Sequence, residues 1–415
     1  MPAFALSFSA RPWPAVWASA LVCAGLAGNA CADNTTPVVL TFSTTGDSRQ
    51  DPINFDKASV GTTLSGQDAV WLQNTKALAR ILRSIQAQKA GMLFFNGDMV
   101  HGYGWGAFGY TTNPTQTAIN GADNKHTPVP DASWTSATQV NGSDIMKFQR
   151  QYGFWRGVMA PVMEAGTYVF PVAGNHEVQC KACKPGKVAK VENEQLWAEN
   201  MGDLIVDTNR FASILGSAPA NLSYGPAAGT SPDGLTTDQS KLSFSFDFKG
   251  VHFAVINTDA VGKDGQAPTL WLQNDLSAAT GRGAKKLFVF GHKPAFTYAY
   301  LKTGATAPSG LDATSLAAAN ALWDVIESHH AIYFCGHEHI FNISQPRGGA
   351  YQVIVGTAGS PFDAKASDVT KAPATDRSYS WATVKVHADG GTDVQAYGFD
   401  EHFGPTTLLQ QLYLP

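Results

Sequence analysis

The chain has 415 residues, of which 44% are hydrophobic and 15% charged, and its formal net charge is −4. This length suffices for one large domain or two ordinary ones. The aromatic content of 11% argues against disorder despite 40 glycines and 22 prolines. The small net charge gives no reason to expect nucleic acid or an anionic membrane as a partner.

The first 32 residues have the pattern of an export signal. Arg11 is the only charged side chain before Asp33, and residues 15–28 form a short apolar run that ends close to small residues at 30–32. The run is too short for a comfortable membrane span. A lipoprotein fits less well, because the residues before the two cysteines of this segment are not the usual Leu-small-small set. We expect residues 1–32 to be removed, leaving a periplasmic or secreted protein without a membrane span.

Export would leave the cysteines Cys180, Cys183 and Cys335 in an oxidising compartment. There, the Cys-Lys-Ala-Cys pair at 180 and 183 favours a disulfide, with a redox motif or half of a zinc site as alternatives. A zinc site is disfavoured because a second cysteine pair is missing. Cys335 lies in an apolar run and is most simply a buried small residue.

The first elements form a predicted βαβ unit. Residues 38–43 are β-branched and aromatic and predict a strand, which ends before Asp47. From residue 68 to residue 85, apolar side chains recur at spacings of three and four, which indicates a helix. Residues 92–95 form a second apolar strand, followed by Asp98. Two parallel strands would bring both aspartates to one edge of the sheet.

A long aperiodic stretch separates this unit from the next strand. Residues 102–143 predict a surface loop, of the kind that carries function. Residues 143–165 show a broken helical pattern, and residues 168–173 predict a buried strand leading into Gly174-Asn175-His176-Glu177. Residues 178–242 are expected to be mostly loop, with one short helical piece near 195–197.

The second half repeats the alternation of strands and helices. Residues 241–258 predict a β-hairpin, 271–276 a helix piece and 317–329 a helix. Further strands are expected, at 286–290, 331–335, 351–355 and 381–386. No internal repeat or linker is apparent. We therefore expect one domain at 33–415, with a loop insertion at about 102–143.

Metal-competent residues follow five of these buried strands. They are Asp47, Asp98, Asn175, His292, and His337 with His339. Two divalent metals about 3.5–4 Å apart need a bridging carboxylate, further oxygen or imidazole ligands, and open positions for water and substrate. A ligand set without thiolate suits Zn, Fe, Mn, Ni or Co. A purely structural role for the whole set is disfavoured, because buried polar groups need partners.

These motifs resemble the five blocks of the calcineurin-like metallophosphoesterases, in the family's order and over residues 38–360. The matching blocks are Gly46-Asp47, Gly97-Asp98, Gly174-Asn175-His176-Glu177, Val289-Phe290-Gly291-His292 and Gly336-His337-Glu338-His339. The last two have the form of the purple-acid-phosphatase-like branch. The resemblance implies an α/β fold, a four-layer α/β/β/α sandwich. It also implies two divalent or mixed-valence metal ions, with Fe, Zn or Mn favoured.

The resemblance also implies a role for each residue. Asp98 would bridge the metals. The other ligands would be Asp47 and His339 at the first metal and Asn175, His292 and His337 at the second. His176 would stabilise the transition state or protonate the leaving group. Glu177 would orient His176.

The chain departs from the family at the first metal. The first block usually reads Asp-x-His or Asp-x-Gly, but here Arg49 stands third. An arginine stays protonated and does not ligate metals. We expect it to face a substrate phosphate or to pair with a site carboxylate, with a surface ion pair as the alternative. The branch uses a tyrosine three residues after the bridging aspartate. His101 holds that position, and we expect it to ligate the first metal unless it is merely solvated.

The predicted function is an exported dinuclear phosphoesterase that hydrolyses phosphate monoesters through a metal-bound hydroxide, with a small phosphorylated substrate. A phosphodiesterase acting on a cyclic nucleotide or another diester with the same centre remains open. So does a non-catalytic metal- or phosphate-binding protein, which only the missing first-block histidine favours. A thiol–disulfide protein using Cys180 and Cys183 is disfavoured, because nothing around them is typical of a thioredoxin-like unit. The sequence indicates no oligomeric state.

Overall fold

The structure is a computed structural model. It describes residues 36–50, 71–102, 144–180, 187–298, 309–363 and 374–414. These residues form one compact unit. The expected signal at 1–32 and nearly all of the expected loop at about 102–143 lie outside them.

A mixed sheet carries the N-terminal and C-terminal strands of this unit. Its spatial order is β17-β16-β15-β1-β2-β3. The strands are β1 (Val38–Thr45), β2 (Met92–Phe95), β3 (Tyr168–Pro171), β15 (Tyr379–His387), β16 (Thr392–Phe399) and β17 (Thr407–Leu414). β1, β2 and β3 are parallel, as the βαβ pattern predicted, and the other pairings are antiparallel.

A second mixed sheet is built from the middle of the chain, in the order β13-β14-β12-β11-β8-β7-β6. The strands are β6 (Ala220–Tyr224), β7 (Phe244–Phe248), β8 (Val251–Val255), β11 (Lys286–Phe290), β12 (Ile332–Cys335), β13 (Phe341–Ser344) and β14 (Gln352–Val355). β8, β11, β12 and β14 run parallel. Two small ribbons complete the strands: β4 (Gln179–Cys180) with β5 (Val188–Ala189), and β9 (Asp259–Ala260) with β10 (Lys263–Asp264).

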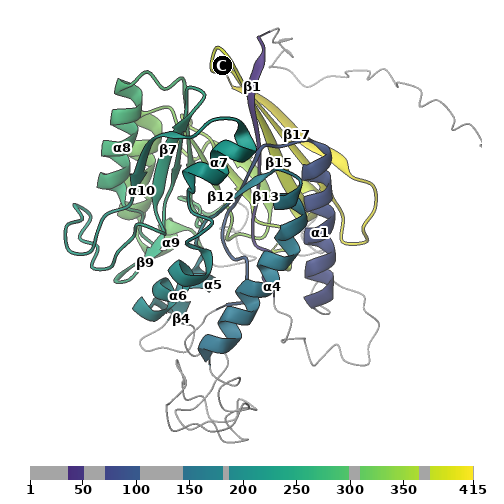
Figure 1. Ribbon diagram of the computed structural model, residues 1–415, viewed down its shortest axis with the longest axis horizontal. Helices are drawn as coiled ribbons and strands as arrows, with labels where there is room; N and C mark the ends of the chain where they lie inside the picture. Colours follow the sequence, from purple (N-terminus) through teal and green to yellow (C-terminus); the bar gives the residue numbers. More distant parts are fainter. Residues whose placement is uncertain are drawn as a thin grey trace, which may run out of the picture. The chain divides into compact units, whose positions relative to one another are not determined.

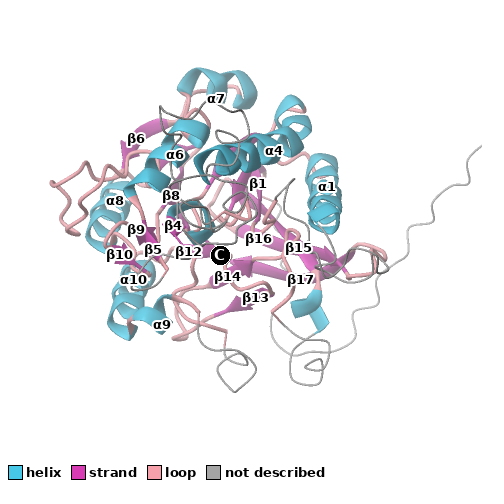
Figure 2. Cartoon of the chain, turned by 90° about the horizontal axis from the view of Figure 1, so that it is seen from below, coloured by secondary structure: helices cyan, strands magenta, loops and turns pink. Residues whose placement is uncertain are grey.

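Helices cover the outer face of each sheet (Figures 1 and 2). α1 (Trp71–Ala87), α4 (Asp144–Glu164) and α6 (Val191–Met201) share a core with the first sheet, and α8 (Thr269–Gly281) and α10 (Leu316–Ser328) share one with the second. The shorter helices are α5 (Asn175–Val178), α7 (Thr208–Leu215), α9 (Leu311–Thr314) and η4 (Ala374–Arg377). No helix of the described ranges is long and apolar enough to cross a bilayer.

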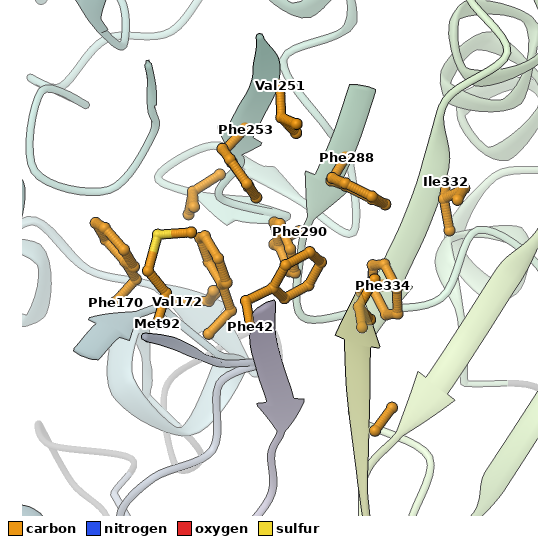
Figure 3. Close-up of a cluster of buried hydrophobic side chains, with 14 of the residues drawn as sticks. Phe42, Met92, Phe170, Val172, Val251, Phe253, Phe288, Phe290, Ile332 and Phe334 are labelled. Atoms are coloured by element: carbon orange, nitrogen blue, oxygen red, sulfur yellow. The ribbon is translucent and has the colours of Figure 1, made fainter. Parts of the chain in front are cut away.

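An aromatic core fills the space between the two sheets (Figure 3). Phe94 of β2 stacks on Phe290 of β11, with ring centroids 3.8 Å apart, and Phe42 of β1 lies edge-on to Phe288 at 5.0 Å. Successive strand residues point to opposite faces, so Phe95 packs outward against Trp155 of α4. The layers are therefore helix, sheet, sheet and helix, which confirms the predicted α/β/β/α sandwich.

The sequence located most elements, and the short helical piece expected near 195–197 lies in α6. Residues 178–242, expected to be mostly loop otherwise, hold more elements than this one. They contain α6 and α7 as well as β5 and β6. α7 carries ordinary end signals: Asp207 accepts hydrogen bonds from the N–H groups of Asn209 and Arg210, and Gly216 ends the helix at φ 86°. Its eight residues are too few for a clear helical period.

The structure describes two of the cysteines, Cys180 and Cys335. Cys180 is disulfide-bonded, whereas Cys183, its expected partner, lies outside the described residues. Cys335 is buried, and it is a free thiol in the part of the chain that the structure describes. The pairing of Cys180 with Cys183 therefore stays a prediction.

Candidate metal centre

The candidate site lies where the carboxyl ends of the central parallel strands of both sheets meet. The turns after β1 and β2 are joined by hydrogen bonds from Asp47 N to Gly97 O and from Arg49 N to Asp98 O, both 2.9 Å. Asp47, Arg49, Asp98 and His337 all have positive φ, between 45° and 69°. Such backbone costs about 1–3 kcal/mol per residue and clusters at functional sites.

Gly97 marks the close approach of the two sheets. Its φ is +85°, and a Cβ at this position would lie 2.4 Å from Nδ1 of His292. Only glycine fits this combination of backbone and space. The turn after β2 can therefore touch a ligand that follows β11.

The first group of candidate ligands is Asp47, Asp98 and His339, whose ligand atoms lie within 4.8 Å of one another. The buried atoms Asp47 Oδ1, Asp98 Oδ2 and His339 Nε2 have no hydrogen-bond partner among the described residues. Nε2 of His339 is 3.6 Å from Oδ1 of Asp47. Buried acceptors without partners are costly, and a cation between them would satisfy all three.

The second group is Asp98, His292 and His337. Nε2 of His292 lies 3.1 Å from Oδ1 of Asp98, 3.1 Å from Nδ1 of His337 and 3.0 Å from Oδ1 of Asn175. Asp98 belongs to both groups, so its carboxylate is placed to bridge two metals. These donor types, oxygen and imidazole, fit Zn, Fe or Mn.

Backbone carbonyls fix the orientation of two ligand rings. Nδ1 of His292 donates to the Asn96 carbonyl at 2.7 Å, and Nδ1 of His339 donates to the Pro361 carbonyl at 2.6 Å. Because a carbonyl only accepts, each ring carries its proton on Nδ1 and directs Nε2 at the site.

Burial tunes the protonation of these groups. It lowers the pKa of His339 to about 4, with help from the Arg49 charge, so this imidazole is neutral near pH 7. Burial also lowers the pKa of His337 and raises that of Asp47. Burial also acts to lower the pKa of His292, but the charge and hydrogen bond of Asp98 outweigh this effect and raise the pKa to about 9.

The Glu177 side chain binds backbone groups around the site. Its carboxylate accepts from the backbone N–H groups of Asp98 at 2.9 Å, Gly174 at 2.8 Å and Val100 at 3.2 Å. The ring of His176 is instead held by the His101 carbonyl, 2.5 Å from Nδ1. The single turn of α5 folds the Glu177 side chain back over the helix start. An orienting role of Glu177 toward His176 stays a prediction.

His176 nevertheless lies at the site. Its backbone N–H donates to Oδ1 of Asp98 at 3.1 Å, and its Nε2 is 3.5 Å from Oδ2 of the same carboxylate. Burial lowers the pKa of its imidazole well below the usual range. The position of the ring fits the predicted role, which would need the protonated ring and remains a prediction.

Arg49 and His101, the two residues at which the sequence departs from the family pattern, have different surroundings. Nη2 of Arg49 is 3.8 Å from Oδ2 of Asp98, so the guanidinium faces a site carboxylate. The ring of His101 packs edge-on against His176, with centroids 6.2 Å apart. Within the described ranges His101 is in neither ligand group, and its ligation of the first metal stays a prediction.

Sequence reasoning missed several supporting residues. Oδ2 of Asp363 accepts from the His339 N–H at 2.8 Å, and Nδ2 of Asn96 donates to Thr44 Oγ1 at 2.8 Å. Nζ of Lys293, the residue after His292, pairs with Oδ1 of Asp259 at 2.6 Å. Asn96 and Lys293 adjoin recognised motifs and could have been flagged. Asp363 lies in irregular chain without a local signal.

Neither a family model nor a curated protein matches the sequence. Solved structures do match. A purple acid phosphatase from yellow lupin (Lupinus luteus) seeds aligns at 12% identity and a TM-score of 0.51, over 90% of this chain and 53% of that one. A dimetal phosphatase from Danio rerio aligns at 11% identity and a TM-score of 0.40, over 91% of this chain and 99% of its own. A 5'-nucleotidase from Candida albicans gives 13% identity and a TM-score of 0.35, over 88% and 52%.

Of these three structures, the lupin phosphatase has a TM-score above 0.5 and shows the fold. The chain spans about half the length of that protein, 53%, and shares its fold. The chain thus has the fold of that purple acid phosphatase, and it has Asp and His groups at the sheet edge that could hold metal. This likeness confirms the fold that the sequence motifs implied.

Proposed function

We propose that the protein is an exported metal-dependent phosphoesterase that hydrolyses phosphate monoesters at a centre of two divalent or mixed-valence ions, with Fe, Zn or Mn favoured. One observation carries the proposal. Three buried acceptor atoms, on Asp47, Asp98 and His339, lack hydrogen-bond partners among the described residues, and they adjoin a second ligand group that shares Asp98. Asn175, His292 and His337 complete the second site.

The chain's own residues would divide the chemistry. Bound metals would lower the pKa of a coordinated water and neutralise phosphate charge. Arg49 would hold a phosphate oxygen through its guanidinium. The Nδ1–H of His176 is committed to the His101 carbonyl, 2.5 Å away, which leaves Nε2 to face the substrate. Nε2 would assist the leaving group only in the imidazolium form, which carries a proton on both nitrogens. We retain His101 as a candidate further ligand of the first metal.

Two alternatives share this site. A phosphodiesterase would use the same metals, and residues at about 102–143 would then select the substrate. A non-catalytic metal- or phosphate-binding protein is favoured by a single observation, the Arg49 guanidinium only 3.8 Å from the shared Asp98 carboxylate.

We further propose that residues 1–32 are removed on export and that residues 33–415 act as a single catalytic domain in the periplasm or outside the cell. The disulfide at Cys180 supports an oxidising compartment.

Hydrolysis of p-nitrophenyl phosphate and of its bis ester tests the proposal. We expect monoester hydrolysis that a chelator abolishes and that added metal restores. Asp98→Asn removes the bridging charge and should lower kcat/KM by at least about a thousandfold, roughly 4 kcal/mol of transition-state stabilisation. Asp324→Asn, at an exposed carboxylate of α10, is the matched control.

Each outcome separates the candidates. Preference for the bis ester would favour the phosphodiesterase. No turnover with any of Fe, Zn and Mn, combined with tight metal binding, would favour the binding protein. Activity that survives complete metal removal would contradict the mechanism.

A further inference from the structure

We propose that Arg49 makes the Asp47–Asp98–His339 site the weaker of the two metal sites, and that a phosphate anion bound against Arg49 strengthens it. The inference rests on the proposed metal centre. It goes beyond that centre by assigning unequal affinities to its two sites and by coupling one of them to the substrate anion.

The guanidinium is held beside the first site by its own backbone. The Arg49 N–H donates to the Asp98 carbonyl at 2.9 Å, and its Nη2 lies 3.8 Å from Oδ2 of Asp98. That oxygen is one of the three buried acceptor atoms that would bind the first metal. Because a guanidinium cannot release its charge near neutral pH, a metal at this site would face a permanent cation.

The second site has a cation nearby as well, but that cation is paired. Nζ of Lys293 lies 2.6 Å from Oδ1 of Asp259, and both side chains are at least nine-tenths buried. The charge of Lys293 is therefore balanced by a carboxylate that belongs to neither ligand group. In contrast, the single negative charge of Asp98 would have to balance Arg49 and both metals.

An anion would relieve this conflict. The Arg49 side chain is 26% exposed, so part of it is accessible from outside the ligand cluster. A phosphate that contacts both the guanidinium and the first metal would attract each of them. By thermodynamic linkage, phosphate then raises the affinity of the metal, and the metal raises the affinity of phosphate by the same factor.

Titration of the metal-free protein with Mn²⁺, with the free ion measured by electron paramagnetic resonance, tests the proposal. We expect one tight Mn²⁺ per chain and a second at least about tenfold weaker, the effect of a cation some ångströms from the site. Inorganic phosphate should narrow this gap. In Arg49→Ala and Arg49→Gln the two affinities should lie within about threefold, with no effect of phosphate. Arg49→Lys keeps the charge and should keep the gap.

Several results would overturn the inference. They are two equal affinities in the natural protein, an unchanged gap in both neutral variants, or a gap that phosphate does not alter. Circular dichroism checks that each variant is folded, and the gap in the natural protein stands without any variant. Absence of Mn²⁺ binding in every variant would contradict the metal centre and the inference together. A gap that behaves as expected in a protein without hydrolytic activity would support the inference and contradict the proposed function.

Discussion

The Glu177 carboxylate is bonded to three backbone N–H groups, which belong to the turn after β2 and to the start of α5. Burial and the neighbouring Asp98 raise the pKa of this carboxyl to about 7. Glu177 thus positions Asp98 and Asn175 through the backbone, in a place where the sequence suggested a partner for His176.

Glu177→Gln should therefore affect stability and metal content. The amide replaces one accepting oxygen of Glu177 with an NH₂ group, which cannot accept from the backbone N–H groups. We therefore expect the free energy of unfolding to fall by about 2–4 kcal/mol. Bound metal should fall too, because the turn that carries Asp98 loses its anchor. Urea denaturation and metal analysis measure the two effects. Glu192→Gln, exposed on α6, is the control. A variant with normal stability and metal but no activity would restore a catalytic role for Glu177.

At the scale of elements, β7, β8 and α8 are joined by a buried histidine between two carboxylates. Nδ1 of His252 lies 2.6 Å from Oδ1 of Asp247, and Nε2 lies 2.9 Å from Oδ2 of Asp275. Both carboxylates accept, so the ring donates at both nitrogens and is an imidazolium. Burial acts to lower the pKa of His252, but the bond and charge of Asp275, reinforced by Asp247, raise it above the usual value.

This arrangement predicts a stability that depends on pH. Because the pKa in the folded protein is raised, the contribution of His252 is fully present below about pH 6.5, the usual value in an unfolded chain, and is lost as pH rises through the folded value. We expect His252→Gln to lower the free energy of unfolding by about 2 kcal/mol at pH 6 and by clearly less at pH 9. Urea denaturation across this range measures it. His402→Gln, at a side chain 85% exposed, is the control. An equal loss at both pH values would show that the imidazolium is not the stabilising form.

The elements also show where sequence periodicity succeeds. The expected strand at 92–95 and helix at 317–329 match β2 and α10, because each buries a whole face or a long stripe. α7 escaped notice because it buries little apolar surface, with Phe211 as its one fully buried side chain among those described. The hydrogen bonds of Glu177 to backbone N–H groups could not be predicted from the sequence. The direction of its side chain depends on how the chain enters the single turn of α5.

At the scale of the whole molecule, the site depends on how the two sheets pack. Asp47, Asp98 and Asn175 follow strands of the first sheet, whereas His292 and His337 follow strands of the second. The sequence could predict that these residues lie at strand ends. Which two sheets face each other is set by long-range contacts such as Phe94 with Phe290, which have no local signature.

Phe94→Ala should test this dependence. The ring is fully buried between the sheets and stacks on three others. We expect a loss of about 3–5 kcal/mol in the free energy of unfolding. Metal binding should also weaken, because the candidate ligands of the first sheet would no longer be held in place against those of the second. Leu408→Ala, at a side chain 48% exposed, should cost less than about 0.5 kcal/mol. Urea denaturation and Mn²⁺ titration are the measurements. Full metal affinity in a strongly destabilised Phe94→Ala would show that these two sets of ligands align independently of this core.

The position of β1 has a consequence for how the protein is made. β1 lies between β2 and β15, and its register with β15 runs from Val38 with His387 to Thr44 with Ala382. The strand that precedes Asp47 therefore gains one of its two neighbours only when residues 379–387 have been synthesised. A chain still in transit through a ribosome or an export channel cannot complete the sheet. We therefore expect the proposed metals to bind only after residues 379–387 have joined the sheet.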